Sequence, residues 1–213
     1  MTSRHTFRAA AAAFVLVALT ALPARAQVGK GLLDLNVATE AELTSLPNMT
    51  PAVAKAVIER RPFASVTEAN AFLLSQKLTQ EQVNALYAKA FVHMNLNTGT
   101  REEILLIPGA GNRMAREFAE YRPWKSWVQF DKEISKYVGQ AETDRLKQYV
   151  FIPVNLNTAT DDDILSIPGA GRRMVREFKE YRPWKTKEQF DREIGKYVGA
   201  KETARLWRFV VIE

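Results

Sequence analysis

The 213-residue sequence contains no cysteine, which excludes disulfide bonds, thiolate metal ligands and a cysteine nucleophile. Histidine is almost as scarce, with only His5 and His93, so a histidine-based metal cluster is not expected. Charged residues make up 25% of the chain and apolar residues 46%. These proportions are typical of a soluble globular protein and exclude a disordered chain and a polytopic membrane protein.

Only one long hydrophobic run is present, and it lies at the N-terminus. Ala9–Leu22 holds apolar residues and a single threonine, Arg4 and Arg8 precede it, and Ala24-Arg25-Ala26 follows it. This three-part layout predicts a secretory signal peptide over residues 1–26 and a periplasmic or secreted mature protein. The run is shorter than the roughly 20 residues that span a bilayer, so no stable membrane span is expected after cleavage. An uncleaved N-terminal anchor is the alternative.

The remaining sequence consists of one pattern written three times. Residues 95–152 align with residues 155–212 at an offset of 60 without a gap, and about two thirds of the positions are identical. A degenerate copy lies upstream at an offset of 61, where Asn36–Leu43 matches Asn97–Ile104. The sequence therefore predicts three units of about 60 residues over 27–94, 95–154 and 155–213. Their connectors lack a Gly/Ser-rich linker, so the units are expected to abut.

Helix signals fill each unit, and no useful stretch alternates with a period of two. In the second unit, Thr100-x-x-Glu103 reads as a capping box that begins a short helix. Further helices are expected after Gly111 and Ser126, and Gly139 breaks the third from a fourth. The predicted fold class is all-α, with about four short helices in each unit.

A glycine-rich turn separates the first two predicted helices in units two and three. It reads Ile107-Pro-Gly-Ala-Gly111 and Ile167-Pro-Gly-Ala-Gly171. Glycine accepts the positive φ of a tight turn, and its lack of a side chain lets backbone N–H groups approach a ligand closely. The next helix directs its free N–H groups and its positive dipole end the same way, which favours a bound phosphate. A plain structural turn is the alternative.

Arginines in the first turn of the following helices favour the phosphate interpretation. Arg113, Arg172 and Arg173 oppose the helix dipole at a cost of about 0.3–1 kcal/mol each, which a bound anion would offset. Pairs four residues apart could offset it instead, although each contributes only tenths of a kcal/mol. These pairs are Arg113–Glu117, Arg116–Glu120, Arg173–Glu177 and Arg176–Glu180. Arg172 has no such partner, so unit three ranks first as a candidate site and unit two second.

The two glycine-rich turns resemble the helix-hairpin-helix motif, apolar-Pro-Gly-x-Gly followed by a helix. With Asn-Leu-Asn-Thr ahead and Arg-Pro behind, the unit resembles the repeat of the ComEA competence proteins, exported bacterial DNA receptors, from about Asp34 to the C-terminus. The resemblance implies sequence-independent binding of double-stranded DNA during DNA uptake, and partners among periplasmic or inner-membrane uptake proteins. The candidate DNA-binding residues are Gly109, Ala110, Gly111, Arg113, Arg116, Gly169, Ala170, Gly171, Arg172, Arg173 and Arg176.

Unit one departs from this pattern, because Asn48-Met49-Thr50-Pro51 replaces the glycine-rich turn. Asn48 tolerates positive φ, but Thr50 is expected to cap the next helix and to occupy the donors that a phosphate would use. This unit resembles PsbU, an extrinsic photosystem II scaffold with the same fold. The alternative function is therefore a periplasmic scaffold or protein-interaction array that does not bind DNA.

Other residues are interpreted as structural. Trp124 and Trp184 are expected in the core, and Trp127 and Trp207 at a surface or interface. Asp161–Asp163 suit a helix N-terminus, so neither a metal nor a cofactor is predicted. Gly139 and Gly199 mark a second turn in their units that is expected to be structural. No catalytic constellation is present, and the protein is not expected to be an enzyme.

Net charge supports the DNA interpretation only weakly. The formal charge is +6, but Arg4, Arg8 and Arg25 lie in the predicted signal peptide, which leaves 27 basic against 24 acidic residues, or +3. The three units carry 0, +1 and +2 in chain order. Charge therefore rises in the same order as the quality of the glycine-rich turns, but it remains small.

Overall fold

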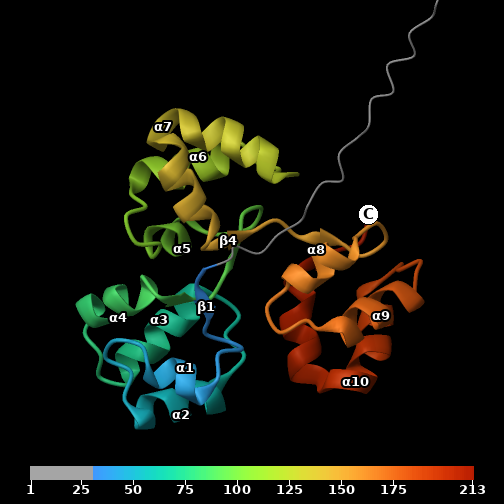
Figure 1. Cartoon of the computed structure of the whole chain (residues 1–213), viewed down its shortest axis with the longest axis horizontal. Helices are drawn as coiled ribbons and strands as arrows, with labels where there is room; N and C mark the ends of the chain where they lie inside the picture. Colours follow the sequence, from blue (N-terminus) through green and yellow to red (C-terminus); the bar gives the residue numbers. More distant parts are fainter. Residues whose placement is uncertain (1–30) are drawn as a thin grey trace, which may run out of the picture.

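The computed structural model describes residues 31–213, so the predicted signal peptide lies outside the described residues. Three lobes follow one another along the chain and meet near β1 and β4 (Figure 1). The first lobe comprises β1 (Leu33–Asp34), α1 (Glu40–Thr44), α2 (Pro51–Arg60), α3 (Val66–Ser75), α4 (Gln80–Tyr87) and β2 (Ala90–Phe91). The second comprises β3 (Met94–Asn95), α5 (Arg101–Leu105), α6 (Asn112–Glu120), α7 (Trp127–Lys147) and β4 (Val150–Phe151). The third comprises β5 (Val154–Asn155), α8 (Asp161–Ser166), α9 (Arg172–Glu180), α10 (Lys187–Trp207) and β6 (Val210–Val211).

The all-α prediction is confirmed for the described residues. Long helices α7 and α10 are each interrupted by a glycine in the left-handed region, Gly139 at φ 76° and Gly199 at φ 77°. Each therefore consists of two helices that meet at a kink, as the sequence predicted for the third and fourth helices. None of the helices between residues 31 and 213 is long and apolar enough to cross a membrane.

Short parallel strands close each lobe, and the sequence did not predict them. The first strand of a lobe pairs with its last, as Met94 does with Val150 and Asn95 with Phe151. The same pairing joins β1 to β2 and β5 to β6. Each strand is only two residues long, too short for alternation between apolar and polar residues to be visible in the sequence.

The recurring Asn and Arg-Pro positions form a clasp within each lobe. In the second lobe the Asn97 side chain accepts from the Trp124 N–H at 2.6 Å and donates to the Trp124 carbonyl at 3.0 Å. Arg122 Nε donates to the Leu96 carbonyl at 2.7 Å. Asn157 and Trp184 repeat the arrangement in the third lobe. These side chains therefore have a structural role, because they satisfy hydrogen-bonding groups of the backbone within the fold.

Two of the tryptophan predictions can be judged directly. Trp124 and Trp184 are each 1% exposed, which confirms their place in the core. The surface prediction for Trp127 is wrong, because this residue is 9% exposed and packs edge-on against Phe130. Trp127 has no counterpart in the third lobe, where Lys187 stands, so the repeat gave no indication of its burial.

The lobes are in contact, as the short connectors predicted. The first and second lobes share one hydrophobic core, in which the rings of Phe91 and Tyr149 lie 5.1 Å apart. The third lobe has a separate core. It reaches the first lobe through Arg208, which donates to the carbonyls of His93 at 3.0 Å and Phe63 at 3.3 Å. This contact between the first and third lobes was not foreseen from the sequence.

Candidate functional site

The glycine-rich turns lie between α5 and α6 and between α8 and α9. Gly109 and Gly169 adopt φ values of 79° and 78°, which favour glycine strongly. Two residues later, Gly111 and Gly171 are the N-cap residues of α6 and α9, with extended φ values of −99° and −112°.

Capping distinguishes α6 and α9 from eight other helix starts that the structure describes. Gly111 and Gly171 provide no side-chain cap. At the other eight starts, a threonine or serine side chain accepts a backbone N–H. The second segments of α7 and α10, which follow Gly139 and Gly199, are not among these eight. The N-termini of α6 and α9 thus keep the donors and partial positive charge that side chains satisfy elsewhere in the chain.

The two glycines of each turn have different structural requirements. The positive φ of Gly109 favours glycine, and a Cβ there would also lie 3.1 Å from Nη2 of Arg145, which would have to shift slightly. A Cβ at Gly111 or Gly171 would meet no atom within 4 Å. Neither backbone strain nor internal packing explains glycine at these two N-cap positions, and both glycines are exposed.

The first lobe has the capped version of the same turn. Asn48 takes φ 61°, as expected for the degenerate turn. The Thr50 side chain accepts from the Val53 N–H at 3.3 Å, and Pro51 is the first helical residue of α2. The prediction that Thr50 occupies a donor at this helix N-terminus is confirmed.

The middle residues of the turns have a different use from the one predicted. The Ala110 N–H donates to the Ile107 carbonyl at 2.9 Å, and Ala170 makes the same bond to Ile167. Ala110 is also buried, at 7% exposure. The amides of the two alanines therefore hold the turn together.

Arginines flank both uncapped N-termini, but not in the predicted pairs. None of the four pairs predicted at a spacing of four residues forms an ion pair among the described residues. Arg113 instead lies over the Tyr137 ring, 4.7 Å from its centroid, and Arg173 lies over Tyr197 at 4.8 Å. Arg176 pairs with the adjacent Glu177 at 3.0 Å. Arg116 and Arg172 are exposed and make no ion pair within residues 31–213.

Buried carboxylates lie beneath these arginines. Glu117 and Glu177 are 8% and 2% exposed, and Oε2 of each has no hydrogen-bond partner. Burial raises the pKa of Glu177, but hydrogen bonds from Arg176 and Tyr197 lower the pKa by more than burial raises it. The pKa of Glu177 therefore lies below its ordinary value. Glu177 is therefore a carboxylate at neutral pH.

The third lobe's turn lies against the first lobe, whereas the second lobe's turn does not. A Cβ at Gly169 would be 3.1 Å from Cγ1 of Val37, in addition to its contact with Arg205. Pro168 and Gly169 line a cavity of about 440 Å³ together with residues of the first lobe, including Asp34. The Arg205 side chain is 1% exposed, whereas its counterpart Arg145 is 32% exposed.

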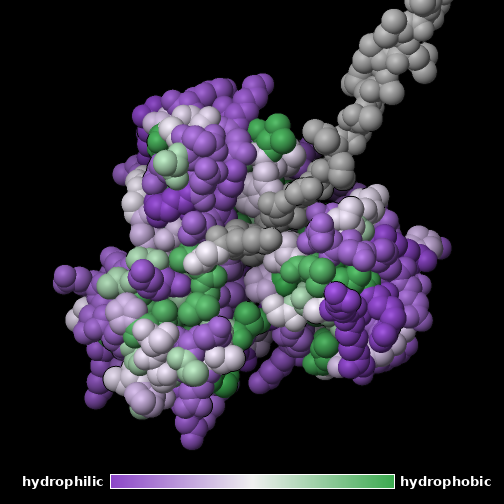
Figure 2. Space-filling view, in the orientation of Figure 1, coloured by the Kyte–Doolittle hydropathy of each residue, from purple (hydrophilic) through white to green (hydrophobic). Residues whose placement is uncertain are grey.

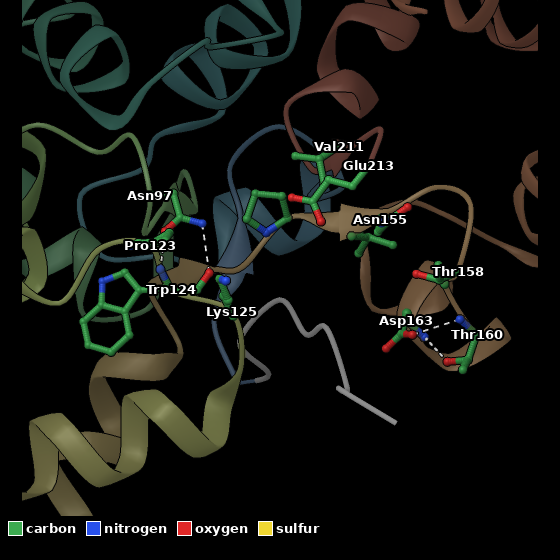
Figure 3. Close-up of a pocket in the computed structure, with 13 residues that line it drawn as sticks. Asn97, Pro123, Trp124, Lys125, Asn155, Thr158, Thr160, Asp163, Val211 and Glu213 are labelled. Atoms are coloured by element: carbon green, nitrogen blue, oxygen red, sulfur yellow. Dashed lines mark hydrogen bonds between the residues drawn. The ribbon is translucent and has the colours of Figure 1, made fainter. Parts of the chain in front are cut away.

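Another cavity, of about 710 Å³, lies between the second and third lobes, away from the glycine-rich turns (Figure 3). Most of the polar groups drawn there have structural partners. Asn97 belongs to the clasp, and Asp163 accepts from the Thr160 N–H at 2.9 Å in a capping box at the start of α8. This cavity gives no indication of a ligand.

Sequence reasoning missed Tyr137, Tyr197, Arg145 and Arg205, which surround the turns. The signal was present, because both pairs recur at the offset of 60. Their roles nevertheless depend on contacts between α6 and α7 and between α9 and α10, which periodicity alone does not reveal. No protein-family model, curated protein or solved structure matches this chain.

Proposed function

We propose that this chain is an exported, sequence-independent double-stranded-DNA-binding protein, with three helix-hairpin-helix units of the ComEA type acting in DNA uptake. The observation that supports this most strongly is the contrast in capping. Eight of the described helices satisfy their N-termini with a side chain, while α6 and α9 begin at open glycines flanked by arginines. A DNA phosphate fits that combination of free N–H groups, dipole and positive charge.

Binding through main-chain N–H groups and arginines reads the phosphate backbone and leaves the bases unread. Affinity should therefore be similar for unrelated sequences. It should also fall steeply with salt, with a slope of about −0.9 for each phosphate neutralised. Because the mature net charge is small, useful affinity would require at least two hairpins on the same duplex.

The two hairpins differ in their neighbours, although Gly109 and Gly169 are both exposed. Gly109 contacts only its own lobe, whereas Gly169 is placed against Val37. We therefore place the second lobe first for DNA binding, which reverses the order predicted from the unpaired Arg172. In the third lobe, Gly171, Arg172 and Arg173 remain exposed beside the partly covered turn.

A periplasmic scaffold without DNA is the second candidate. The capped turn of the first lobe favours it, because Thr50 occupies a donor that a phosphate would need. The surface also supports it. Green hydrophobic areas appear on the first and third lobes towards the centre of Figure 2, and Leu165, 43% exposed, lines an α8–α9 groove of about 910 Å³ with Val175.

An anisotropy titration of the mature protein with random duplex DNA at low and moderate salt distinguishes the two functions. A matched pair of variants adds specificity, because Arg116 on α6 and Lys55 on α2 occupy equivalent positions at an offset of 61. Arg116→Glu should weaken binding to every duplex and reduce the salt slope by about one. Lys55→Glu makes the same change in net charge and should have little effect. Absence of binding at about 50 mM salt would instead favour the scaffold.

A further inference from the structure

Arg113 and Arg173 rest on an aromatic platform that is built twice. Each guanidinium lies over a tyrosine ring, at 4.7 Å for Tyr137 and 4.8 Å for Tyr197. The hydroxyl of Tyr137 is 2.8 Å from that of Tyr121, and the corresponding distance between Tyr197 and Tyr181 is 2.9 Å. Tyr137 lies on α7 two residues before Gly139, so the stack ties the start of α6 to the second turn of the same lobe.

A buried carboxylate fixes each platform from below. Hydrogen bonds from Tyr137 to Tyr121 and Glu117 raise the pKa of the Tyr137 hydroxyl well above its ordinary value. In the third lobe, hydrogen bonds from Tyr197 to Tyr181 and Glu177 likewise raise the pKa of the Tyr197 hydroxyl. A neutral tyrosine has one O–H, so the arrangement that satisfies all three groups has Tyr121 donating to Tyr137 and Tyr137 donating to Glu117. Holding a carboxylate at 8% exposure with one oxygen unpartnered is unfavourable for stability alone, which suggests a role beyond packing.

The first lobe lacks the whole arrangement together with the open glycine turn. At the offset of 61, the positions of Arg113, Glu117, Tyr121 and Tyr137 are occupied by Ala52, Ala56, Arg60 and Gln76. The lobes with an uncapped helix N-terminus are thus the two lobes that carry the platform.

We propose that Tyr137 and Tyr197 are positioning residues that hold Arg113 and Arg173 ready for a DNA phosphate. This inference rests on the proposed function. Stacking uses the face of the guanidinium and leaves its N–H edges free, whereas an ion pair with a carboxylate would occupy them. A long side chain already held on a ring also loses less conformational freedom when the phosphate binds, so binding is stronger.

Two sets of substitutions separate the ring from its hydroxyl. Tyr137→Phe with Tyr197→Phe keeps the ring, so DNA affinity should stay within about twofold of the unmodified protein. The thermal midpoint should fall, because each buried carboxylate loses its tyrosine donor. Tyr137→Leu with Tyr197→Leu removes the ring and should weaken DNA binding about five- to tenfold. A positioning role therefore predicts that phenylalanine rescues affinity without rescuing stability.

A double-mutant cycle supplies the decisive comparison. Arg113→Ala with Arg173→Ala should weaken binding about as much as the leucine substitutions, and the two sets combined should be no weaker than either alone. Losses that multiply in the combined variant, or an affinity that tracks the thermal midpoint across all variants, would overturn the inference. If the arginine substitutions weaken binding but the leucine substitutions do not, the inference fails while the proposed function survives. If the unmodified protein does not bind duplex DNA, the proposed function itself fails.

Discussion

Two glycines separated by one residue perform different tasks in each turn. Gly109 is needed by the fold, because it combines φ 79° with the approach of the Arg145 guanidinium. Gly111 is needed by neither criterion, since it has extended φ and open space around it. The Pro-Gly-x-Gly motif therefore joins a glycine that the fold requires to a glycine that neither φ nor packing requires.

Gly109→Ala should destabilise the protein by about 1–2 kcal/mol, because a side chain at positive φ is strained. The contact with Arg145 adds to the cost. A chemical denaturation curve measures the change in the free energy of unfolding. Gly99→Ala is not a suitable control, because its Cβ would lie 2.4 Å from Met94 Sδ. Gly139→Ala serves better, since it has the same positive φ with no atom within 4 Å, and the difference between the two variants isolates the Arg145 contact.

Asp34 provides a second prediction at the scale of a single residue. Its Oδ2 lies 2.7 Å from Nδ1 of His93, and its Oδ1 accepts from the Asn36 N–H at 2.7 Å. Complete burial raises the pKa of Asp34, but the hydrogen bond and charge of His93 more than reverse this effect, so the pKa lies below 3.8. A depressed carboxyl pKa stabilises the fold above the unfolded value, and that stability is lost as pH falls through the folded value.

Asp34→Asn should therefore lower the free energy of unfolding by about 1–3 kcal/mol at neutral pH. The difference from the unmodified protein should shrink below about pH 3.8, where Asp34 becomes protonated as the chain unfolds. Urea denaturation at several pH values measures both effects. A difference that stays constant down to pH 2 would show that Asp34 contributes through packing rather than charge.

At the scale of elements, helix capping divides the described helices into two sets. Thr50 and Gly111 hold the same N-cap position in equivalent helices, and the first satisfies a donor that the second leaves free. A free donor at a helix N-terminus lowers stability relative to a capped one. Leaving it free in the two lobes that also carry flanking arginines is expected if the donor is used for binding.

Gly111→Ser with Gly171→Ser should change stability and DNA affinity in opposite directions. Open space at both positions accommodates the side chain, and a serine cap should leave the thermal midpoint unchanged or slightly raised. The hydroxyl would then compete with a phosphate for the same N–H groups, so DNA affinity should fall about tenfold. Thermal melting and anisotropy titration of one sample provide both values. Undiminished affinity would show that these N–H groups do not contact the phosphate.

For the whole molecule, the contact between the first and third lobes places Val37 beside the third lobe's glycine-rich turn. Arg208 joins them by bonds to two first-lobe carbonyls, and burial lowers the pKa of its guanidinium. The counterpart of Arg208 in the second lobe is Gln148. The corresponding arginines consequently differ in exposure, because the Arg145 side chain is 32% exposed and the Arg205 side chain is 1% exposed.

Arg208→Ala should loosen this contact and move the Gly169 turn away from Val37 of the first lobe. Small-angle scattering should report a larger radius of gyration, since the third lobe has its own core and can remain folded when it moves. DNA affinity should rise in a background where Gly111→Ser and Arg113→Glu disable the second lobe's hairpin. An unchanged radius and affinity would show that the contact between the lobes does not limit access to the third hairpin.

The sequence by itself determined the all-α class, the helix boundaries at proline and glycine, the capping of α2 by Thr50 and the burial of Trp124 and Trp184. Each of these follows from local backbone chemistry or from a repeated pattern, and such signals lie within a few residues of one another. Tertiary structure alone decided the stacking of Arg113 on Tyr137, the burial of Trp127, the strand pairs and the covering of Gly169 by Val37. Those features arise between residues far apart in the chain, where the choice of partner depends on how helices and lobes pack. Two lobes with nearly the same sequence differ because the third places its glycine-rich turn beside Val37 of the first lobe, while the second shares a core with the first through other residues.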